Sequence, residues 1–222
     1  MSNKKYIILV PDGMADEPVA ELSGKTPLEA ARTPNMDFLV MQGLSGLVKT
    51  IPDGMSPGSD VGNLALMGYD PTKNFSGRAP LEAASMGVKL EDNEIAFRCN
   101  LITESQGLMH DYSAGHISSE DAKVLIEHLQ RVLNETNIKF YPGKSYRHLM
   151  VVKSDDVSMM CKIKTKAPHD ILNQAIVPFL PSGQGSEVLL KLMTKSKQIL
   201  SDHPLNQARV KAGESPANMI WL

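Results

Sequence analysis

The sequence contains few cysteines, no long run of one charge and no long apolar segment, and each absence excludes a class of protein. The two cysteines, Cys99 and Cys161, lie far apart and form no CxxC pair. Secreted chains that depend on disulfides carry more cysteine, so we expect reduced thiols and a cytoplasmic protein. The net charge is −2, which argues against a nucleic-acid partner and against binding to a membrane surface.

The apolar run near the N-terminus, YIILV, is followed at once by Pro-Asp-Gly. It is too short for the hydrophobic core of a signal peptide and far too short to span a membrane. The sequence also lacks a GxxxxGKS/T loop, so it does not predict a P-loop nucleotide site. With 42% hydrophobic and 22% charged residues, the composition is that of an ordinary globular protein.

A strand–helix–strand pattern opens the chain. KYIILV is a continuous apolar run, which is typical of a strand buried on both faces of a parallel sheet. Thr33 and Pro34 form a helix start, and Gly43 fits the position just after the helix end. LSGLVKTI then predicts a second strand. This βαβ order favours an α/β fold with a right-handed crossover.

The pattern changes after about residue 90. EIAFRCNLITESQGLMHDY contains two β-rich runs around a Glu-Ser-Gln-Gly turn, which predicts a hairpin. ISSEDAKVLIEHLQRVLN predicts an amphipathic helix that begins with a capping box at Ser118. IKFYPG and YRHLMVVK are further strand candidates, SEVLLKLMTKSKQILSDH predicts a long helix, and ANMIWL predicts a buried strand.

These patterns predict three segments. Residues 1–89 begin an α/β domain, residues 90–177 form an inserted α+β module, and residues 178–222 return to the α/β domain. A buried strand seldom ends a fold without a turn after it. We therefore expect ANMIWL to lie within a longer protein, with the α/β domain incomplete in these 222 residues. The alternative is a true terminus whose last strand pairs at the edge of a sheet.

The tetrapeptide PDGM occurs twice, with Asp12 in the first copy and Asp53 in the second. Asp12 follows the predicted strand YIILV by one residue. It therefore falls at the carboxyl end of a strand, where ligands bind in open α/β sheets. Gly13 allows a sharp turn beside it and leaves room for a metal or a phosphate. The alternative is an aspartate that forms an Asx turn or caps a helix. Asp53 we assign to loop structure.

Ser59 lies six residues beyond Asp53, in MSPGSDVGN, just before a predicted helix. Unpaired backbone N–H groups and the helix dipole favour an anion at such a position. A hydroxyl there can act as a nucleophile when a bound divalent metal favours its ionisation. The alternative is that Ser59 is only an N-cap, which is the commonest role of serine before a helix.

Taken together, these segments resemble one family. IILVPDGM followed by SPGSDVGNLALMGYDP is similar to the alkaline phosphatase superfamily. Within it, the closer likeness is to the archaeal type of 2,3-bisphosphoglycerate-independent phosphoglycerate mutase, which also occurs in bacteria. Nearly the whole chain takes part, through the segments GRAPLEAASMG, AFRCNLIT, DYSAGHIS, GKSYRHLMV, APHDI and HPLNQARVKAGESPANMIWL, in the same order.

The resemblance implies an alkaline-phosphatase-like α/β sheet flanked by helices and interrupted by an α+β lid domain. It also implies two divalent cations, expected to be Mn²⁺, with Mg²⁺, Co²⁺ or Zn²⁺ as alternatives, and no bisphosphoglycerate. Asp12 matches a metal ligand, and Ser59 matches the serine that binds metal and takes up the phosphoryl group. The implied reaction of glycolysis and gluconeogenesis moves the phosphate of 3-phosphoglycerate to Ser59 and back to the other hydroxyl.

For the lid domain, the resemblance suggests residues that contact the small phosphorylated substrate. Arginine suits a carboxylate or a phosphate because it can donate two parallel hydrogen bonds. Each of these residues could instead belong to a surface pair or to the core. His128 we expect to be structural. The candidates in the lid domain are Asp111, His116, Arg147, His148, His169 and Asp170, and Arg78 is a further candidate near the loop of the first domain.

One departure limits the expected activity. In the family, most remaining metal ligands come from a C-terminal region rich in Asp and His, and these 222 residues do not contain it. We therefore expect the chain alone not to catalyse the mutase reaction. Alternatives are another phosphatase or phosphotransferase of the superfamily, including proteins labelled homoserine kinase, or a non-catalytic fragment that binds a phosphorylated small molecule. The sequence leaves the oligomeric state open.

Overall fold

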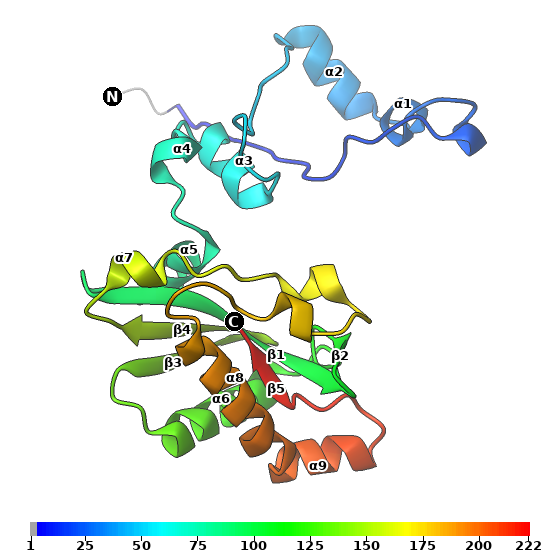
Figure 1. Ribbon diagram of the computed structural model, residues 1–222. Coiled ribbons are helices and arrows are strands. Elements are labelled where there is room, and N and C mark those ends of the chain that lie inside the picture. Colours follow the sequence, from blue (N-terminus) through cyan, green and yellow to red (C-terminus); the bar gives the residue numbers. More distant parts are fainter. Residues whose placement is uncertain (1–3) are drawn as a thin grey trace. The chain divides into compact units, whose positions relative to one another are not determined.

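A computed structural model describes residues 4–222. The chain divides into two compact units, one ending at Phe75 and the other beginning at Ser76. Figure 1 shows the elements of each unit. Together they form a mixed α/β protein whose antiparallel sheet is flanked by helices. None of the described helices is long and apolar enough to cross a membrane.

The first unit consists of short helices joined by extended segments. α2 begins at Pro34 and ends at Gln42, with Gly43 as its C-cap, so the predicted helix is confirmed. α3 begins at Ser59, and the preceding Gly58 occupies the N-cap position. The helices of this unit are η1 (Ala20–Leu22), α1 (Pro27–Ala30), α2 (Pro34–Gln42), α3 (Ser59–Leu66) and α4 (Pro71–Asn74).

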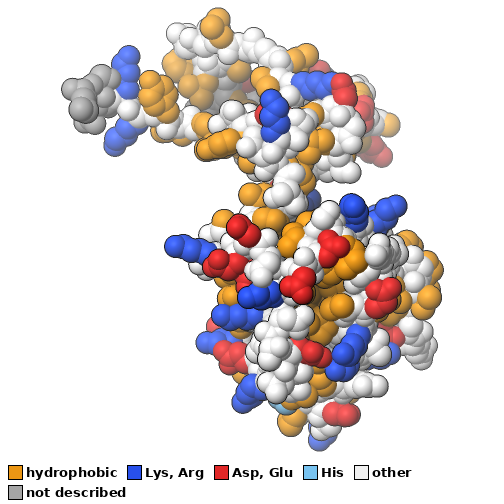
Figure 2. Space-filling model, turned by 60° about the vertical axis from the view of Figure 1, so that its left-hand side comes forward, with side chains coloured by type: hydrophobic (Ala, Val, Ile, Leu, Met, Phe, Trp, Pro, Cys, Tyr) orange, Lys and Arg blue, Asp and Glu red, His pale blue; other side chains and the backbone are white. Residues whose placement is uncertain are grey.

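The two strands predicted for this unit are not formed in the described chain. Residues 5–10 and 44–50 have extended or irregular backbone without strand pairing. Their apolar side chains are exposed, with Leu9 at 84% and Leu47 at 105% of full exposure. Apolar runs of this kind become strands of a parallel sheet only when neighbouring strands pair with them, and no described segment of the unit does so. Figure 2 shows apolar side chains gathered on the visible surface of this unit.

The second unit is built on one antiparallel sheet in the order β2-β1-β4-β3, with β5 also paired to β1. The predicted hairpin is confirmed, with Gln106 and Gly107 at positive φ in its turn. The strands are β1 (Glu94–Ser105), β2 (Leu108–Asp111), β3 (Ile138–Lys144), β4 (Arg147–Lys153) and β5 (Met219–Trp221). The helices are α5 (Arg78–Ser85), α6 (Ser119–Leu133), α7 (Val157–Met160), η2 (Pro168–Ile171), η3 (Val177–Phe179), α8 (Glu187–Ser201) and α9 (Pro204–Lys211).

The sheet is covered on both faces. Met150 and Val152 of β4 belong to the large core that includes side chains of α6 and α8, whereas Leu149 and Val151 pack against α5. This alternation is the two-residue period of a strand. Figure 1 shows α6 and α8 together on one side of the sheet and α5 on the other. α6 begins at the predicted N-cap Ser118, whose side chain accepts a hydrogen bond from the N–H of Asp121.

Residues 178–222 pack with the second unit. Side chains of α8 belong to its large core, and β5 pairs antiparallel with β1, Leu101 facing Ile220 in register. The two compact units meet in the sequence between Phe75 and Ser76. The division into an α/β domain with an inserted module over residues 90–177 stays a prediction.

Candidate functional site

Asp12 and Ser59 lie 47 positions apart in the sequence and meet in the first unit. The Ser59 hydroxyl donates a hydrogen bond of 2.6 Å to Asp12 Oδ2. Asp12 lies in a turn in which its own N–H donates to the carbonyl of Val10 and Gly13 has a φ of +76°. Both residues line an open cavity of about 470 Å³, whose walls come from residues 10–15, 50–51 and 57–66.

Ser59 lies at a helix start, where an anion such as a phosphoryl group would be stabilised. It is the first residue of α3, and because Gly58 is the N-cap, the Ser59 side chain makes no capping bond. The first N–H groups of a helix lack partners within the helix, and the dipole adds positive potential there. A phosphoryl group that approaches Ser59 would meet these donors. Asp53, by contrast, is exposed and pairs with Lys49 at 2.6 Å, in agreement with its assignment to loop structure.

The donor set of this pair fits part of a metal site. The Asp12 carboxylate and the Ser59 hydroxyl offer the oxygen ligands that hard divalent cations prefer. Within residues 4–222, no group of three or more His, Cys, Asp or Glu side chains is arranged to hold a metal. Two ligands from one carboxylate and one hydroxyl do not complete the coordination of a cation. The described residues could therefore supply only some of the ligands that such a site needs.

A second cluster, in the second unit, gathers around Tyr112 and Tyr146. Their rings meet edge to face with centroids 5.9 Å apart. His169 lies 6.2 Å from Tyr112, and His116 lies 6.4 Å from Tyr146, again between ring centroids. The Arg147 guanidinium lies over the Tyr146 ring at 5.2 Å. The structure therefore brings together three of the predicted substrate residues, from segments far apart in the sequence.

Positive charge surrounds Asp170 beside this cluster. Lys166 pairs with the Asp170 carboxylate at 2.9 Å, and His169 Nε2 lies 3.5 Å from it. The hydrogen bond from Lys166 lowers the pKa of Asp170, and the charges of Lys166, His169 and Arg78 act in the same direction. Arg78 is the first residue of α5, so predicted residues from two segments act on the Asp170 carboxylate. This site can attract an anionic ligand, with the tyrosines as its apolar wall.

The side chains of Asp111 and His148, both predicted to contact substrate, form hydrogen bonds within the chain. The Asp111 carboxylate accepts hydrogen bonds from the N–H and hydroxyl of Ser113 and from the N–H of Gly115, each at 2.7 Å. Burial raises the pKa of Asp111, but these hydrogen bonds outweigh that effect and the pKa is lowered. Both carboxylate oxygens are thus used to hold a loop.

His148 is only 2% exposed. Its Nδ1 accepts a hydrogen bond of 3.0 Å from the N–H of Gly143, and burial lowers its pKa to about 4. Neighbouring residues of a strand face opposite sides of the sheet, so Arg147 and His148 cannot both face one ligand. Arg147 is exposed, and His148 is part of the interior.

Tyr112, Tyr146 and Lys166 were not among the residues predicted from the sequence. Each lies within three positions of a predicted one, in DYSAGH, KSYRH and KAPHD. A tyrosine close to His or Arg in two of these segments, and a lysine close to His in the third, were the available signal. A single sequence did not show that the three segments meet.

Comparison with known proteins identifies the family. Residues 41–206 match the profile of the PhosphMutase family, described as 2,3-bisphosphoglycerate-independent phosphoglycerate mutase. The chain belongs to this family. The name of the family implies reactions that need no bisphosphoglycerate. The predicted resemblance is therefore confirmed over most of the chain.

The phosphoglycerate mutase of Methanosarcina mazei is 50% identical over 98% of this chain and 54% of its own length. A probable mutase of Geobacter sulfurreducens is also 50% identical, over 98% and 55%. The solved cofactor-independent phosphoglycerate mutase of Thermoplasma acidophilum is 29% identical with a TM-score of 0.56, covering 94% of this chain and 55% of its own. A protein from Pyrococcus horikoshii is 26% identical with a TM-score of 0.67, over 94% and 48%. The chain spans about half the length of the curated relatives it matches.

Proposed function

We propose that the protein to which this chain belongs interconverts 3-phosphoglycerate and 2-phosphoglycerate through a phosphoserine at Ser59. The observation that carries the proposal is the hydrogen bond of 2.6 Å between Ser59 and Asp12 at the start of α3. Membership of the mutase family supports it. We place the protein in the cytoplasm, because its two cysteines form no disulfide and glycolytic substrates occur there.

In the first half of the reaction, Ser59 Oγ attacks the phosphorus of 3-phosphoglycerate and the bond from phosphorus to the C3 oxygen breaks. The proton of Ser59 leaves along its hydrogen bond to Asp12, and the C3 oxygen takes up a proton. In the second half, the C2 hydroxyl attacks the phosphorus of the phosphoserine and loses its proton, the bond from phosphorus to Ser59 Oγ breaks, and Ser59 Oγ takes a proton back from Asp12. The N–H groups at the start of α3 bind the phosphoryl oxygens throughout.

Asp12 and Ser59 are the residues of this chain that would hold a divalent cation, Mn²⁺ or otherwise Mg²⁺, Co²⁺ or Zn²⁺. When bound, a pair of such ions supplies the charge neutralisation that phosphoryl transfer requires. The cluster around Tyr112 and Tyr146 has a separate task. We propose that Arg147, His116 and His169 bind the anionic groups of the phosphoglycerate, with Lys166 and Arg78 adding positive charge.

The test uses the full-length protein, assayed with 3-phosphoglycerate and Mn²⁺ without bisphosphoglycerate. Ser59→Ala should lower the rate by more than about a thousandfold, because it removes the nucleophile. Ser56→Ala, an exposed serine of the same loop, is the matched control and should stay within about twofold. Mass spectrometry of quenched enzyme should find the phosphate on Ser59. Normal turnover of Ser59→Ala would exclude the phosphoserine, and release of inorganic phosphate would indicate a phosphatase.

A further inference from the structure

The loop Ser113–His116 has an unusual backbone. Ala114, Gly115 and His116 follow one another with φ values of +50°, +67° and +51°. Residues with a Cβ avoid this left-handed region, and Ala114 and His116 both carry one. Such a run persists only when surrounding groups hold it, and strained backbone of this kind occurs preferentially at functional sites. The loop also carries His116, one of the residues proposed to bind substrate.

Asp111 and Ser113 hold this loop from within. Asp111 accepts from the N–H groups of Ser113 and Gly115, at 2.7 Å each. Ser113 Oγ in turn accepts a hydrogen bond of 3.2 Å from the N–H of His116. These contacts orient the N–H groups of the loop. The Ala114 carbonyl takes no part in them and accepts a hydrogen bond from another part of the chain.

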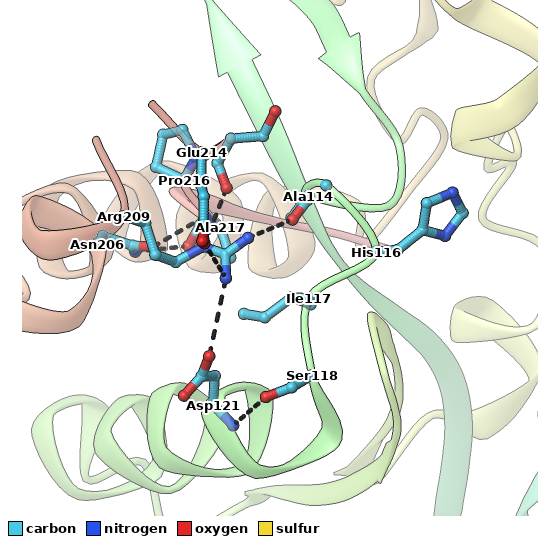
Figure 3. A network of polar contacts seen from close by, with 12 residues as sticks. Ala114, His116, Ile117, Ser118, Asp121, Asn206, Arg209, Glu214, Pro216 and Ala217 are labelled. Carbon is cyan, nitrogen blue, oxygen red and sulfur yellow. Dashed lines mark hydrogen bonds and ion pairs between the residues drawn. The ribbon is translucent and has the colours of Figure 1, made fainter. Parts of the chain in front are cut away.

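Arg209 of α9 supplies that partner. Its Nη2 donates to the Ala114 carbonyl and its Nε to the Ser215 carbonyl, both at 3.0 Å. Nη1 lies 3.0 Å from Glu214 and 3.7 Å from Asp121. Figure 3 shows this guanidinium between the loop, α6 and the 214–217 segment. The planar fork of an arginine can connect several acceptors in this way, whereas a lysine ammonium cannot do so with the same geometry.

Hydrogen bonds of Asn206 connect α9 to the segment that follows it. Asn206, one turn earlier in α9, donates to the carbonyls of Leu200 and Ala217 and accepts from the N–H of Ala217, at 2.8–2.9 Å. A Cβ added at Gly115 would lie 3.4 Å from Arg209 Nη2 and 3.3 Å from the Ser215 Cβ. The guanidinium therefore packs tightly against the loop and leaves it little freedom.

The conformation of this loop sets the direction in which the His116 side chain points. In Figure 3 the His116 ring points away from Arg209, and its centroid lies 6.4 Å from that of Tyr146. Arg209 and His116 are therefore on opposite sides of the same strained turn. We propose that Arg209 is a positioning residue, which holds Ala114–His116 in the left-handed conformation and so sets His116 against Tyr146. Its meaning for catalysis rests on the proposed function, in which His116 binds substrate.

The test is a double-mutant cycle in the full-length protein. Arg209→Gln should raise KM for 3-phosphoglycerate about tenfold or more with a smaller change in kcat, because a misplaced group weakens binding. In a His116→Ala background the same change should alter KM by less than about twofold, because Arg209 acts through His116. Arg209→Lys should fall between. Lys211→Gln, an exposed cation of the same helix, is the control and should leave KM unchanged. Equal effects of Arg209→Gln in both backgrounds would overturn the proposal.

A second measurement does not require turnover. The ring proton resonances of His116 should move in Arg209→Gln toward those of a freely exposed histidine, because the ring leaves Tyr146. They should stay in place in Lys211→Gln. Unchanged His116 resonances in a folded Arg209→Gln protein would exclude the positioning role even if Ser59 proves catalytic. If Arg209→Gln alters the His116 resonances but the full-length wild type has no mutase activity, the positioning role is supported and the proposed function is rejected.

Discussion

His148 should make the second unit less stable as the pH falls. The side chain is 2% exposed, and its Nδ1 is used as an acceptor for the Gly143 N–H. Its Nε2 is buried and has no hydrogen-bond partner among the described residues. Protonation would therefore remove an acceptor and leave a buried charge. This is why the pKa of His148 is lowered from 6.5 to about 4.

The sign and size of the effect follow from linkage. Because the folded pKa lies below the unfolded value, the unfolded chain binds the proton more readily at acid pH. The contribution of neutral His148 is complete above pH 6.5 and is lost as the pH falls from 6.5 to about 4. At 1.36 kcal/mol per pKa unit, the total is about 3 kcal/mol, of which about 2 kcal/mol is lost by pH 5.

Urea unfolding at pH 7.5 and pH 5.0 measures this loss. Trp221, the single tryptophan of the chain, is 2% exposed in the core of this unit, so its fluorescence reports unfolding there. His148→Asn keeps an acceptor near the Gly143 N–H but does not titrate in this range. The wild-type unfolding free energy should fall by about 2 kcal/mol more than that of His148→Asn. His110→Asn, at an exposed position, should behave like the wild type. Equal losses in wild type and His148→Asn would refute the reasoning.

Two further substitutions test the packing of the second unit. A Cβ at Gly143 would overlap the Arg147 carbonyl oxygen across the irregular β3–β4 pairing, so Gly143→Ala should cost more than about 2 kcal/mol. Gly213→Ala, at a positive φ but in open space, should lower the unfolding free energy by only about 1 kcal/mol. Similar urea midpoints for the two variants would contradict the overlap at Gly143. Asn206, 1% exposed, makes three backbone hydrogen bonds, and Asn206→Ala should lower the unfolding free energy by about 3 kcal/mol. Gln207→Ala removes a hydrogen bond of 3.4 Å to the Asp202 carbonyl at an exposed position and should change the unfolding free energy by less than about 0.5 kcal/mol. An equal loss in both variants would show that the Asn206 bonds contribute little.

Local signals in the sequence predicted most of the second unit. Ser118 and the 3.6-residue periodicity predicted α6, and the Glu-Ser-Gln-Gly turn predicted the β1–β2 hairpin, in which Gln106 and Gly107 have positive φ. These signals act between residues close in the chain, so they do not depend on the rest of the fold. Which residues of α6 are buried depends on its packing against the sheet. Val124 and Val132 are 46% and 51% exposed, because the position of the sheet decides which side of an apolar face is buried.

The sequence was less informative about the first unit. YIILV and LSGLVKTI have the composition of buried parallel strands, yet both remain unpaired among the described residues. A strand is stabilised by hydrogen bonds to its neighbours and by layers on both faces, and neither is encoded in the strand itself. The same reason accounts for β5, whose strand character was predicted and whose pairing with β1 was not.

For the candidate site, the sequence by itself determined the chemistry of the residues and the local geometry around them. Asp12 beside a glycine turn and Ser59 at a helix start follow from neighbouring residues alone. Only the tertiary structure decided that the two side chains meet at 2.6 Å. It also decided that Arg147 is exposed while His148 is buried, and that Arg209 donates to the Ala114 carbonyl in the loop of His116. Contacts between residues far apart in the chain depend on how whole elements pack, and no single segment carries that information.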